Sequence, residues 1–433
     1  MNENWKSRSS NPLNPKNLRL ISGGAVEHYD YIIAGGGLSG LSLAYHLAHS
    51  SLGDKKMLIV DQSPKRQNDR TWGFWSDRTT PFESIVDRSW SRLRFVSPGL
   101  ERIAELGAYR YNVIRGLDFY KFVREDLAAR DNITFKRGRV RQIEDGPYEA
   151  QVLIDDQTVS AKWVFDSCYG RADVQTYPSR YHHLKLHFAG WEIRTDKSSF
   201  DPEVATLMDF RASQEGETRF FYLLPFDERQ ALVEYTIFSK AVLGHGDYDY
   251  VGALRGYIKE QLGIETYEIV RREKGCIPIS DQPFARRLGR RVMSIGARGG
   301  RIKPTTGYAF SRIHADSAAI IDSLLRTGRP FDVPADPYRY RLCDSILLDV
   351  MEERGEEVRP IFEAMFANNS IGRIFRFLDE AAPPWEHLAI IPTLPPRPFL
   401  RALLHRRVWA ARSGVSGSSG RLWPHMGRHR ITQ

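Results

Sequence analysis

The sequence of 433 residues is 42% hydrophobic and 12% aromatic, which indicates a globular protein of more than one domain and excludes an intrinsically disordered one. Its three scattered cysteines have no metal-ligand spacing, so they favour a reducing compartment and argue against a disulfide framework or a zinc site. The formal net charge of +9 is concentrated near the end of the chain, because eight arginines and no acidic residue follow Glu386. No run is apolar for long enough to predict a transmembrane helix, and the arginine-rich end is not accompanied by the aromatic residues of a nucleic-acid-binding fold.

The chain begins with an extension, residues 1–28, which lacks the apolar core of a signal peptide and is predicted to be disordered. A βαβ unit follows, with a buried strand at 29–35, a glycine-rich turn into an amphipathic helix, and a second buried strand at 55–62. A helix is predicted at 115–130. Two more strand-like runs then lead to a buried parallel strand at 160–170.

The turn of the βαβ unit carries a glycine motif. Gly35, Gly37 and Gly40 match G-x-G-x-x-G directly after a strand and at the start of a helix. The first two glycines let the backbone approach a pyrophosphate, and the third lets the helix pack on the strand. Asp61 ends the next strand, as expected of an acid that binds the ribose of FAD or NAD. The alternative is a tight β–α turn without a cofactor.

A predicted antiparallel meander follows, formed by strand-like runs at 184–194, 205–211, 218–226 and 230–238. Glu234 lies in the middle of the last run. Strand periodicity places its side chain on the same face as Leu232 and Phe238. A carboxylate on such a face is either at an exposed edge or held in an apolar site for a chemical reason.

The chain then returns to its first domain through a strand, a glycine-rich loop and a helix at 290–325. Gly296, Gly299 and Gly300 would let the backbone approach an isoalloxazine ring or a pyrophosphate, or serve packing alone. With one dinucleotide fingerprint and a return through a second glycine-rich turn, the layout favours FAD over NAD. From residue 336 the chain is predicted to be mostly helical.

These elements predict an α/β protein with a Rossmann-type FAD-binding domain and an inserted antiparallel sheet. The predicted parts are an FAD-binding domain (29–180 with 285–335), a substrate domain (181–284), a helical C-terminal region (336–411) and a basic flexible tail (412–433).

The chain contains, in this order, the stretches "YDYIIAGGGLSGLSLAYHL", "RTWGFW", "LMDFR", "RFFYLLPF", "LVEYT", "GCIPIS" and "IGARGGRIKPTTGYAF". Together they resemble the lycopene β-cyclases of bacterial carotenoid synthesis, from about residue 29 to about residue 400. The most specific are the run P-T-T-G-Y and the series MD…RF-x-Y-x-L-P…E-x-T. The resemblance implies a redox-neutral isomerase that uses reduced FAD, with NAD(P)H as the external reductant, to convert the linear ψ ends of lycopene into β-ionone rings. It also implies that Glu234 stands at the place of an essential acid. Burial would keep such an acid protonated until it is needed.

The resemblance suggests further site residues, each with a plainer alternative. Asp209 is either a second cavity carboxylate or a surface acid. Thr306 and Gly307 either place backbone N–H groups near the flavin or cap the following helix. Aromatic residues are expected to line the substrate cavity, although such residues more often belong to a core: Trp72, Trp75, Phe221 and Tyr308.

Two rival functions share these features: a redox flavoenzyme, such as a monooxygenase or prenyl reductase, and a non-enzymatic carotenoid carrier. The arginine-rich C-terminal stretch mixes apolar and basic residues. We expect it to dock on the cytoplasmic face of an anionic membrane, because lycopene is found in the bilayer. The alternative is a tail that remains free in solution. The sequence does not predict the oligomeric state.

Overall fold

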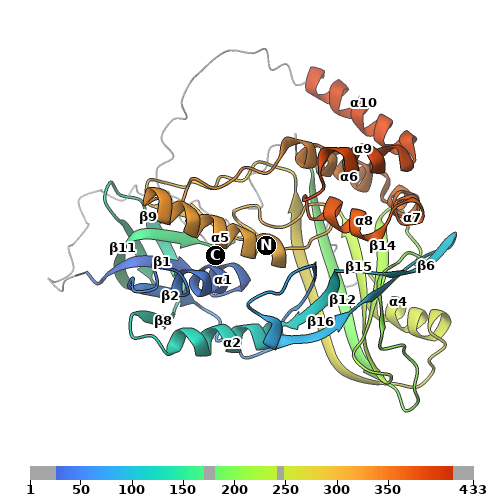
Figure 1. Ribbon diagram of the computed structural model, residues 1–433, viewed down its shortest axis with the longest axis horizontal. Coiled ribbons are helices and arrows are strands. Elements are labelled where there is room, and N and C mark those ends of the chain that lie inside the picture. Colours follow the sequence, from blue (N-terminus) through green and yellow to red (C-terminus); the bar gives the residue numbers. More distant parts are fainter. Residues whose placement is uncertain (1–25, 170–180, 241–247, 413–433) are drawn as a thin grey trace, which may run out of the picture.

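The computed structural model describes residues 26–169, 181–240 and 248–412, and within these ranges the strands form three sheets (Figure 1). The predictions of a disordered start and a flexible tail concern residues 1–25 and 413–433, which lie outside the described ranges.

The first sheet contains β1 (His28–Ala34), β2 (Met57–Asp61), β8 (Ile133–Arg137), β9 (Val140–Glu144), β10 (Ala150–Ile154), β11 (Gln157–Asp166) and β17 (Val292–Ser294). The strand order is β8-β2-β1-β11-β10-β9, with β17 beside β11. Strands β8, β2, β1, β11 and β17 run parallel, as predicted for the βαβ unit and for the strand that begins near residue 160.

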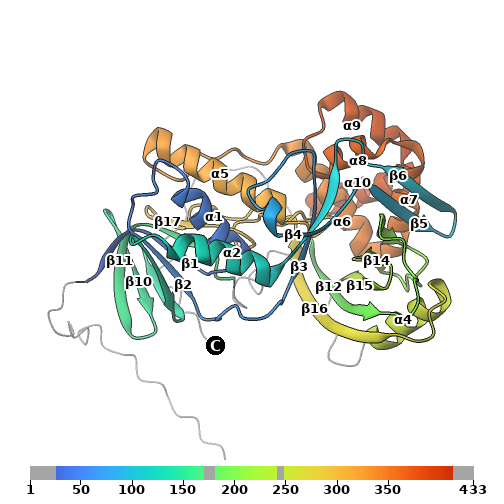
Figure 2. The same ribbon diagram turned by 60° about the horizontal axis from the view of Figure 1, so that its bottom comes forward.

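Three helices cover one face of this sheet: α1 (Leu38–Ala48), α2 (Gly116–Ala128) and α5 (Phe310–Thr327) (Figure 2). On that face Ile33 and Ile59 pack into one core with the helices. On the opposite face Ile32 and Leu58 pack with Val152 of β10. Because both faces are covered, β1 and β2 read as continuous apolar runs without alternation.

The second sheet contains β5 (Arg92–Ser97), β6 (Leu100–Glu105), β12 (His183–Arg194), β13 (Val204–Asp209), β14 (Thr218–Pro225), β15 (Gln230–Ser239) and β16 (Glu268–Ser280). Its order is β16-β12-β15-β14-β13-β5-β6. The predicted meander is present in β13, β14 and β15, but β12 pairs with β15 and β16 and not with β13.

The place beside β13 is taken by β5, in parallel, and β5 with β6 forms a hairpin. This hairpin comes from residues 92–105, which the sequence assigned to the FAD-binding segment. A small third sheet contains β3 (Thr71–Ser76), β4 (Val86–Trp90) and β7 (Arg110–Arg115). In the sequence, β3 and β4 directly precede the hairpin and β7 follows it. The predicted boundary at residue 181 therefore does not separate the strands of the two large sheets.

The C-terminal region is helical, as predicted, and consists of α6 (Tyr338–Arg354), α7 (Val358–Asn368), α8 (Ile371–Leu378), α9 (Pro384–Ile390) and α10 (Pro396–Arg412). Helices α6 to α8 pack on one face of the second sheet, where the rings of Phe95 and Phe366 stack at 4.3 Å. The other face is covered by α4 (Tyr250–Gly256) and the π-helical turn that follows it. No helix in the described ranges is long and apolar enough to span a bilayer.

Candidate active site

The turn from β1 into α1 has the shape of a phosphate-binding turn. Gly35 adopts φ +103°, and a Cβ on Gly40 would lie 1.8 Å from the carbonyl oxygen of Gly35, so both positions require glycine. A Cβ on Gly37 would instead meet no atom within 4 Å. The backbone therefore faces open space at the N-terminus of α1, where partial positive charge favours an anion. The first turn of α1 has no acidic residue that would repel one.

Asp61 lies at the carboxyl end of β2 beside this turn. Its Oδ2 accepts a hydrogen bond from the Gly36 backbone N–H at 2.7 Å, and its Oδ1 accepts one from the Ser63 N–H at 2.6 Å. These bonds fix the carboxylate next to the glycine turn, at the position expected of a ribose-binding acid.

The second glycine-rich loop approaches the same helix. A Cβ on Gly296, which has φ +62°, would lie 2.3 Å from Oγ of Ser39 in α1. Gly300 instead packs against the ring of Phe284, and Gly299 against the backbone of the loop. The structure therefore places Gly296 beside the first turn, while Gly299 and Gly300 are closely packed within the loop.

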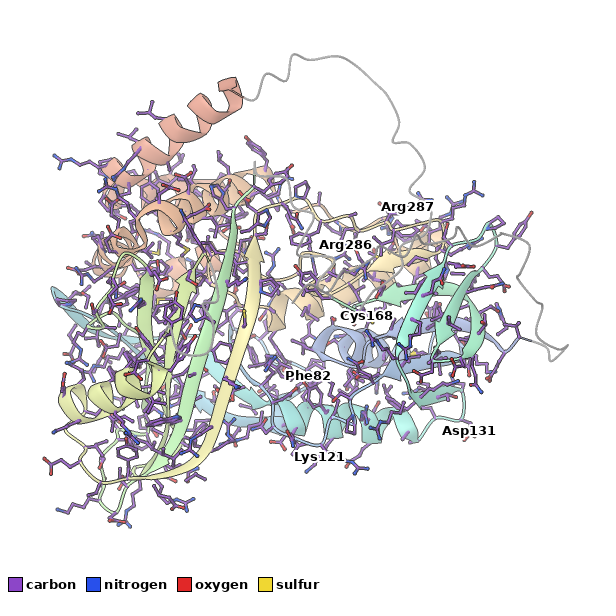
Figure 3. The ribbon with its side chains drawn as sticks, turned by 180° about the vertical axis from the view of Figure 1, so that it is seen from behind. Phe82, Lys121, Asp131, Cys168, Arg286 and Arg287 are labelled. Carbon is purple, nitrogen blue, oxygen red and sulfur yellow. The ribbon has the colours of Figure 1, made fainter. Side chains whose placement is uncertain are left out.

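Arg286, labelled in Figure 3, anchors this loop to α5. Its Nη2 donates to both carboxylate oxygens of Asp316, at 2.8 and 2.9 Å, and its Nη1 donates to the Gly299 carbonyl oxygen at 3.3 Å. The loop is thereby held against the dinucleotide domain.

A cavity of about 200 Å³ lies between the second sheet, β3 and the loop that precedes α5. Trp72, Thr306, Gly307 and Tyr308, all predicted site residues, line it. Other lining residues are mostly apolar or aromatic and include Tyr111, Leu186, Phe188, Tyr222, Leu224, Leu232, Ile277 and Phe310. The loop that follows the second glycine turn therefore forms one wall of a largely apolar chamber.

Two predicted cavity residues lie elsewhere. Trp75 is buried behind the wall, stacked on Phe375 at 4.7 Å, and its indole N–H donates to Asp379. Phe221 lies on the opposite face of the second sheet, where its ring stacks on Tyr257 at 4.0 Å. Its neighbour Tyr222 faces the cavity instead, because successive side chains of a strand point to opposite faces.

Glu234 lies on the cavity wall, in the middle of β15, and not at an exposed edge. Its side chain is partly accessible, and the accessible part faces the cavity. Burial raises the pKa of Glu234 well above its ordinary value, and the nearby Glu273 carboxylate raises it further. Thr236 donates a hydrogen bond to its Oε1 at 3.3 Å. Burial and the neighbouring carboxylate therefore both favour the protonated form of Glu234.

A tyrosine cluster faces this acid. The hydroxyls of Tyr111 and Tyr308 are 3.0 Å apart, and Tyr222 hydrogen bonds to Tyr308. Burial raises the pKa of all three phenols, so they remain neutral. They give the cavity an aromatic, uncharged wall close to Glu234.

The prediction of Asp209 as a second cavity carboxylate is not supported by its position. Asp209 is fully buried on the far side of the sheet, where Nη2 of Arg211 lies 2.5 Å from its Oδ2 and the Tyr257 hydroxyl donates to the same oxygen at 2.8 Å. A carboxylate neutralised in this way is a structural ion pair.

The second carboxyl beside Glu234 is Glu273 of β16, which sequence reasoning missed. Gly190 of β12 stands opposite both glutamates in the sheet. Only the pairing of β12 with both β15 and β16 brings them together, and no local pattern reveals it. Among the described residues there is no cluster of side chains suited to a metal ion.

A dinucleotide-type sheet joined to a large antiparallel sheet is also the fold of a geranylgeranyl bacteriochlorophyll reductase-like protein from Thermoplasma acidophilum. The match has a TM-score of 0.54 and 15% identity, and it covers 89% of this chain and 98% of that one. The model of the lycopene cyclase protein family then matches residues 30–404. The chain belongs to this family, as its sequence motifs predicted.

Individual relatives are more distant. A chloroplastic neoxanthin synthase from Solanum tuberosum is 26% identical over 315 residues, which are 69% of this chain and 61% of the relative. A lycopene beta-cyclase from Paracoccus sp. (strain N81106 / MBIC 01143) is 34% identical over 138 residues, 31% of this chain and 35% of the relative. The matches to the neoxanthin synthases of Solanum tuberosum and Solanum lycopersicum span about 60% of the length of those proteins.

Proposed function

We propose that this protein is a lycopene β-cyclase, which closes β-ionone rings at the linear ψ ends of lycopene to give γ-carotene and β-carotene. One observation carries the proposal: Glu234 is a carboxyl group with a raised pKa on the wall of an aromatic cavity, opposite the loop that follows the second glycine turn. An acid shielded from water, beside walls that neither attack nor neutralise a carbocation, fits acid-catalysed cyclisation of an alkene.

FAD is the cofactor we propose. Gly35 and Gly37 provide a turn with open space for a pyrophosphate, and Asp61 is fixed where an adenosine ribose would lie. Thr306 and Gly307 would hold the isoalloxazine end, since they line the cavity that contains Glu234. Bound in its reduced form, with NAD(P)H as external reductant, FAD supplies negative charge near a carbocation.

The residues of the cavity then account for the reaction. Glu234 donates its proton to the terminal double bond of the ψ end, and a C–H bond and a tertiary carbocation form. The remaining double bond attacks the cation and closes the ring, and loss of a neighbouring proton restores an alkene. Tyr111, Tyr222 and Tyr308 present neutral aromatic surface throughout, which stabilises positive charge without trapping it. One proton enters and one leaves, so no electrons are exchanged.

The size of the cavity indicates how the substrate binds. At about 200 Å³ it is smaller than the roughly 300–1,000 Å³ of pockets that enclose whole drug-sized ligands. It therefore suits one end group, while the rest of the polyene extends outward. We expect the two ends of lycopene to be cyclised in separate binding events.

Expression in a lycopene-accumulating cell tests the proposed function, with Glu234→Gln as the inactive control. We expect β-carotene, with γ-carotene as the intermediate, and no change in molecular mass. A product heavier by oxygen would indicate a monooxygenase, and one heavier by hydrogen a reductase. Unchanged lycopene, in a cell where the protein is folded and contains flavin, would contradict the proposal.

Docking on the cytoplasmic face of an anionic membrane is the second part of the proposal. Large apolar side chains are exposed on α9 and α10 and in the turn between them, including Trp385 (70% exposed), Leu388 (72%) and Leu404 (63%). Arg397 lies on the same segment, and α10 extends away from the body of the molecule (Figure 1). Apolar side chains flanked by arginines fit shallow insertion into a bilayer, from which the enzyme would take its substrate.

A further inference from the structure

A row of residues crosses the second sheet on the face that lines the cavity. Tyr222 of β14 stands opposite Glu234 of β15, and Gly190 of β12 stands between Glu234 and Glu273 of β16. A Cβ on Gly190 would lie 3.1 Å from Cγ of Glu273 and 3.4 Å from Cβ of Glu234. The two carboxyl side chains therefore lean over the glycine from either side, within hydrogen-bonding reach of one another.

The surroundings of Glu273 differ from those of Glu234. Its Oε2 accepts hydrogen bonds from Thr71 Oγ1 at 2.7 Å and from Arg271 Nη1 at 2.6 Å. The positive charge of Arg271 therefore lies directly against Oε2 of Glu273. Its other oxygen, Oε1, is buried and receives no hydrogen bond from the ordinary donors of the described residues. Such an oxygen is stabilised by the proton of a neighbouring carboxylic acid.

We propose that Glu273 is the ionised half of a carboxyl pair that holds one proton on Glu234 and thus keeps the cavity acid loaded for ring closure. The inference rests on the proposed cyclase function and extends it to a residue outside the cavity wall. Because Glu273 does not line the cavity, it is a positioning residue that acts through Glu234. Two adjacent buried carboxyls cannot readily both ionise, so the pair retains one proton.

The proton balance of the pair follows from the reaction. The pair starts with one proton, which leaves Glu234 to form the new C–H bond. Two carboxylates then lie side by side while the ring C–C bond closes. Their repulsion favours recapture of the proton released when the neighbouring C–H bond breaks. The pair ends with one proton, ready for the next end group, and no oxidant or reductant is consumed.

The charged groups around the pair determine in which direction each substitution should shift the pKa of Glu234. Arg271 also pairs with Glu192, which in turn binds Arg115, and Arg70 lines the cavity. The three tyrosines facing Glu234 are neutral. Burial and then the Glu273 charge raise the pKa of Glu234, whereas Arg271 lowers it. Removal of Glu273 and removal of Arg271 should therefore shift the titration of Glu234 in opposite directions.

The experiment is an infrared titration of the FAD-bound protein without lycopene, following the carbonyl stretch of the protonated carboxyl that disappears in Glu234→Gln. We expect Glu273→Gln to lower the midpoint of this band by about one pH unit or more, and Arg271→Gln to raise it. With lycopene, the pH at which activity is lost on the alkaline side should move with the band in each variant.

Glu192→Gln is the matched control, because it removes a buried carboxylate from the same arginine network without contact to Glu234. Its midpoint should remain near that of the wild type. An unchanged midpoint in Glu273→Gln would contradict the proposed carboxyl pair. The proposal would also be contradicted if the midpoint shifted in the same direction in Glu273→Gln and in Arg271→Gln. The titration needs no turnover, so failure of the pair is distinguishable from failure of the cyclase function. If Glu273→Gln does not fold, Arg271→Gln still tests the inference, and an unchanged or lowered midpoint contradicts it.

Discussion

Burial of the Glu234 carboxyl has an energetic consequence for the folded protein. A carboxyl whose pKa is raised in the folded state keeps its proton there, while in the unfolded chain it ionises near its ordinary value. Its contribution to stability is present below that ordinary value and is lost as the pH rises toward the raised one. The free energy of unfolding therefore decreases with pH on account of this group, by about 1.4 kcal/mol per pH unit between the two pKa values.

Glu234→Gln separates chemistry from stability. We expect cyclisation to fall by about 10²- to 10⁴-fold, because the amide cannot donate the proton, while FAD binding is retained. The variant should also be more stable than the wild type at pH 8. This difference in unfolding free energy should be larger at pH 8 than at pH 5, since the amide does not titrate. Denaturant unfolding at both pH values and pigment analysis measure the two effects. Parallel unfolding curves at both pH values would show that Glu234 is ionised.

Asp209→Asn provides the contrasting variant. It should destabilise the protein by about 1–3 kcal/mol, because Arg211 and Tyr257 lose a charged partner at a buried site. Activity per folded molecule should remain close to that of the wild type. A large loss of turnover in a fully folded Asp209→Asn protein would contradict the placement of this residue outside the chemistry.

The faces of individual strand residues were only partly predictable. Strand periodicity correctly placed Glu234 with Leu232, because β15 lies in one regular register. The run "RFFYLLPF" in β14 has no alternation, since both faces of the second sheet are buried, so Phe221 and Tyr222 could not be distinguished. Glu273 could not be predicted as a site residue for another reason. Its proximity to Glu234 depends on strand pairing across Gly190 and not on a local sequence pattern.

The turn from β1 into α1 offers a test at two glycines with different duties. Gly37→Val should fold normally and lose FAD, because its side chain extends into open space that a pyrophosphate would occupy. Gly40→Ala should fail to fold, because its Cβ would collide with the Gly35 carbonyl oxygen. Flavin absorbance and thermal unfolding of the two purified variants distinguish these outcomes. Normal FAD binding by Gly37→Val would contradict the cofactor site.

Strand existence was easier to predict than strand partners. The runs that became β1, β2, β12, β14 and β15 were identified within about two residues, because continuous apolar strands stand out in sequence. The hairpin of β5 and β6 was missed. Its alternating charges, as in "RLRF" and "LERIAE", give no sign that it extends the sheet formed by residues after 181.

His182 joins the second sheet to the helical region. Its ring nitrogens lie 2.9 Å from Asp281 and 3.3 Å from Asp349 of α6. Burial lowers the pKa of His182, but hydrogen bonds to these two carboxylates outweigh burial and raise it from 6.5 to about 9. This stabilisation is complete below pH 6.5 and is lost as the pH rises to about 9.

We therefore expect the protein to lose about 3 kcal/mol of unfolding free energy between pH 6.5 and 9 through His182. His182→Gln should be less stable than the wild type at pH 6 and nearly equal to it above pH 9. Denaturant unfolding across this range measures the difference. A constant gap between the two proteins at all pH values would contradict a charged His182.

We expect membrane docking to involve the outermost helices, α9 and α10. Trp385→Ser combined with Leu388→Ser and Leu404→Ser should abolish sedimentation with anionic vesicles, while the wild type should bind at low salt and weakly at high salt. Leu325→Ser is the matched control, since Leu325 is 50% exposed on α5, away from the docking helices. Equal binding of the wild type to neutral and anionic vesicles would remove the electrostatic part of the proposal.

The parallel pairing of β5 with β13 has a consequence for biosynthesis. On the ribosome, Arg92–Ser97 emerges long before Val204–Asp209, so the hairpin of β5 and β6 waits with an unpaired edge until the chain has grown past residue 209. An exposed strand edge invites pairing with other chains. Neither large sheet can be produced as an independent fragment by cutting near residue 181. The C-terminal fragment would lose β5 and β6, the edge strands of the second sheet, and the N-terminal fragment would carry these strands without their partner β13. The nascent protein is therefore expected to depend on chaperones during this interval.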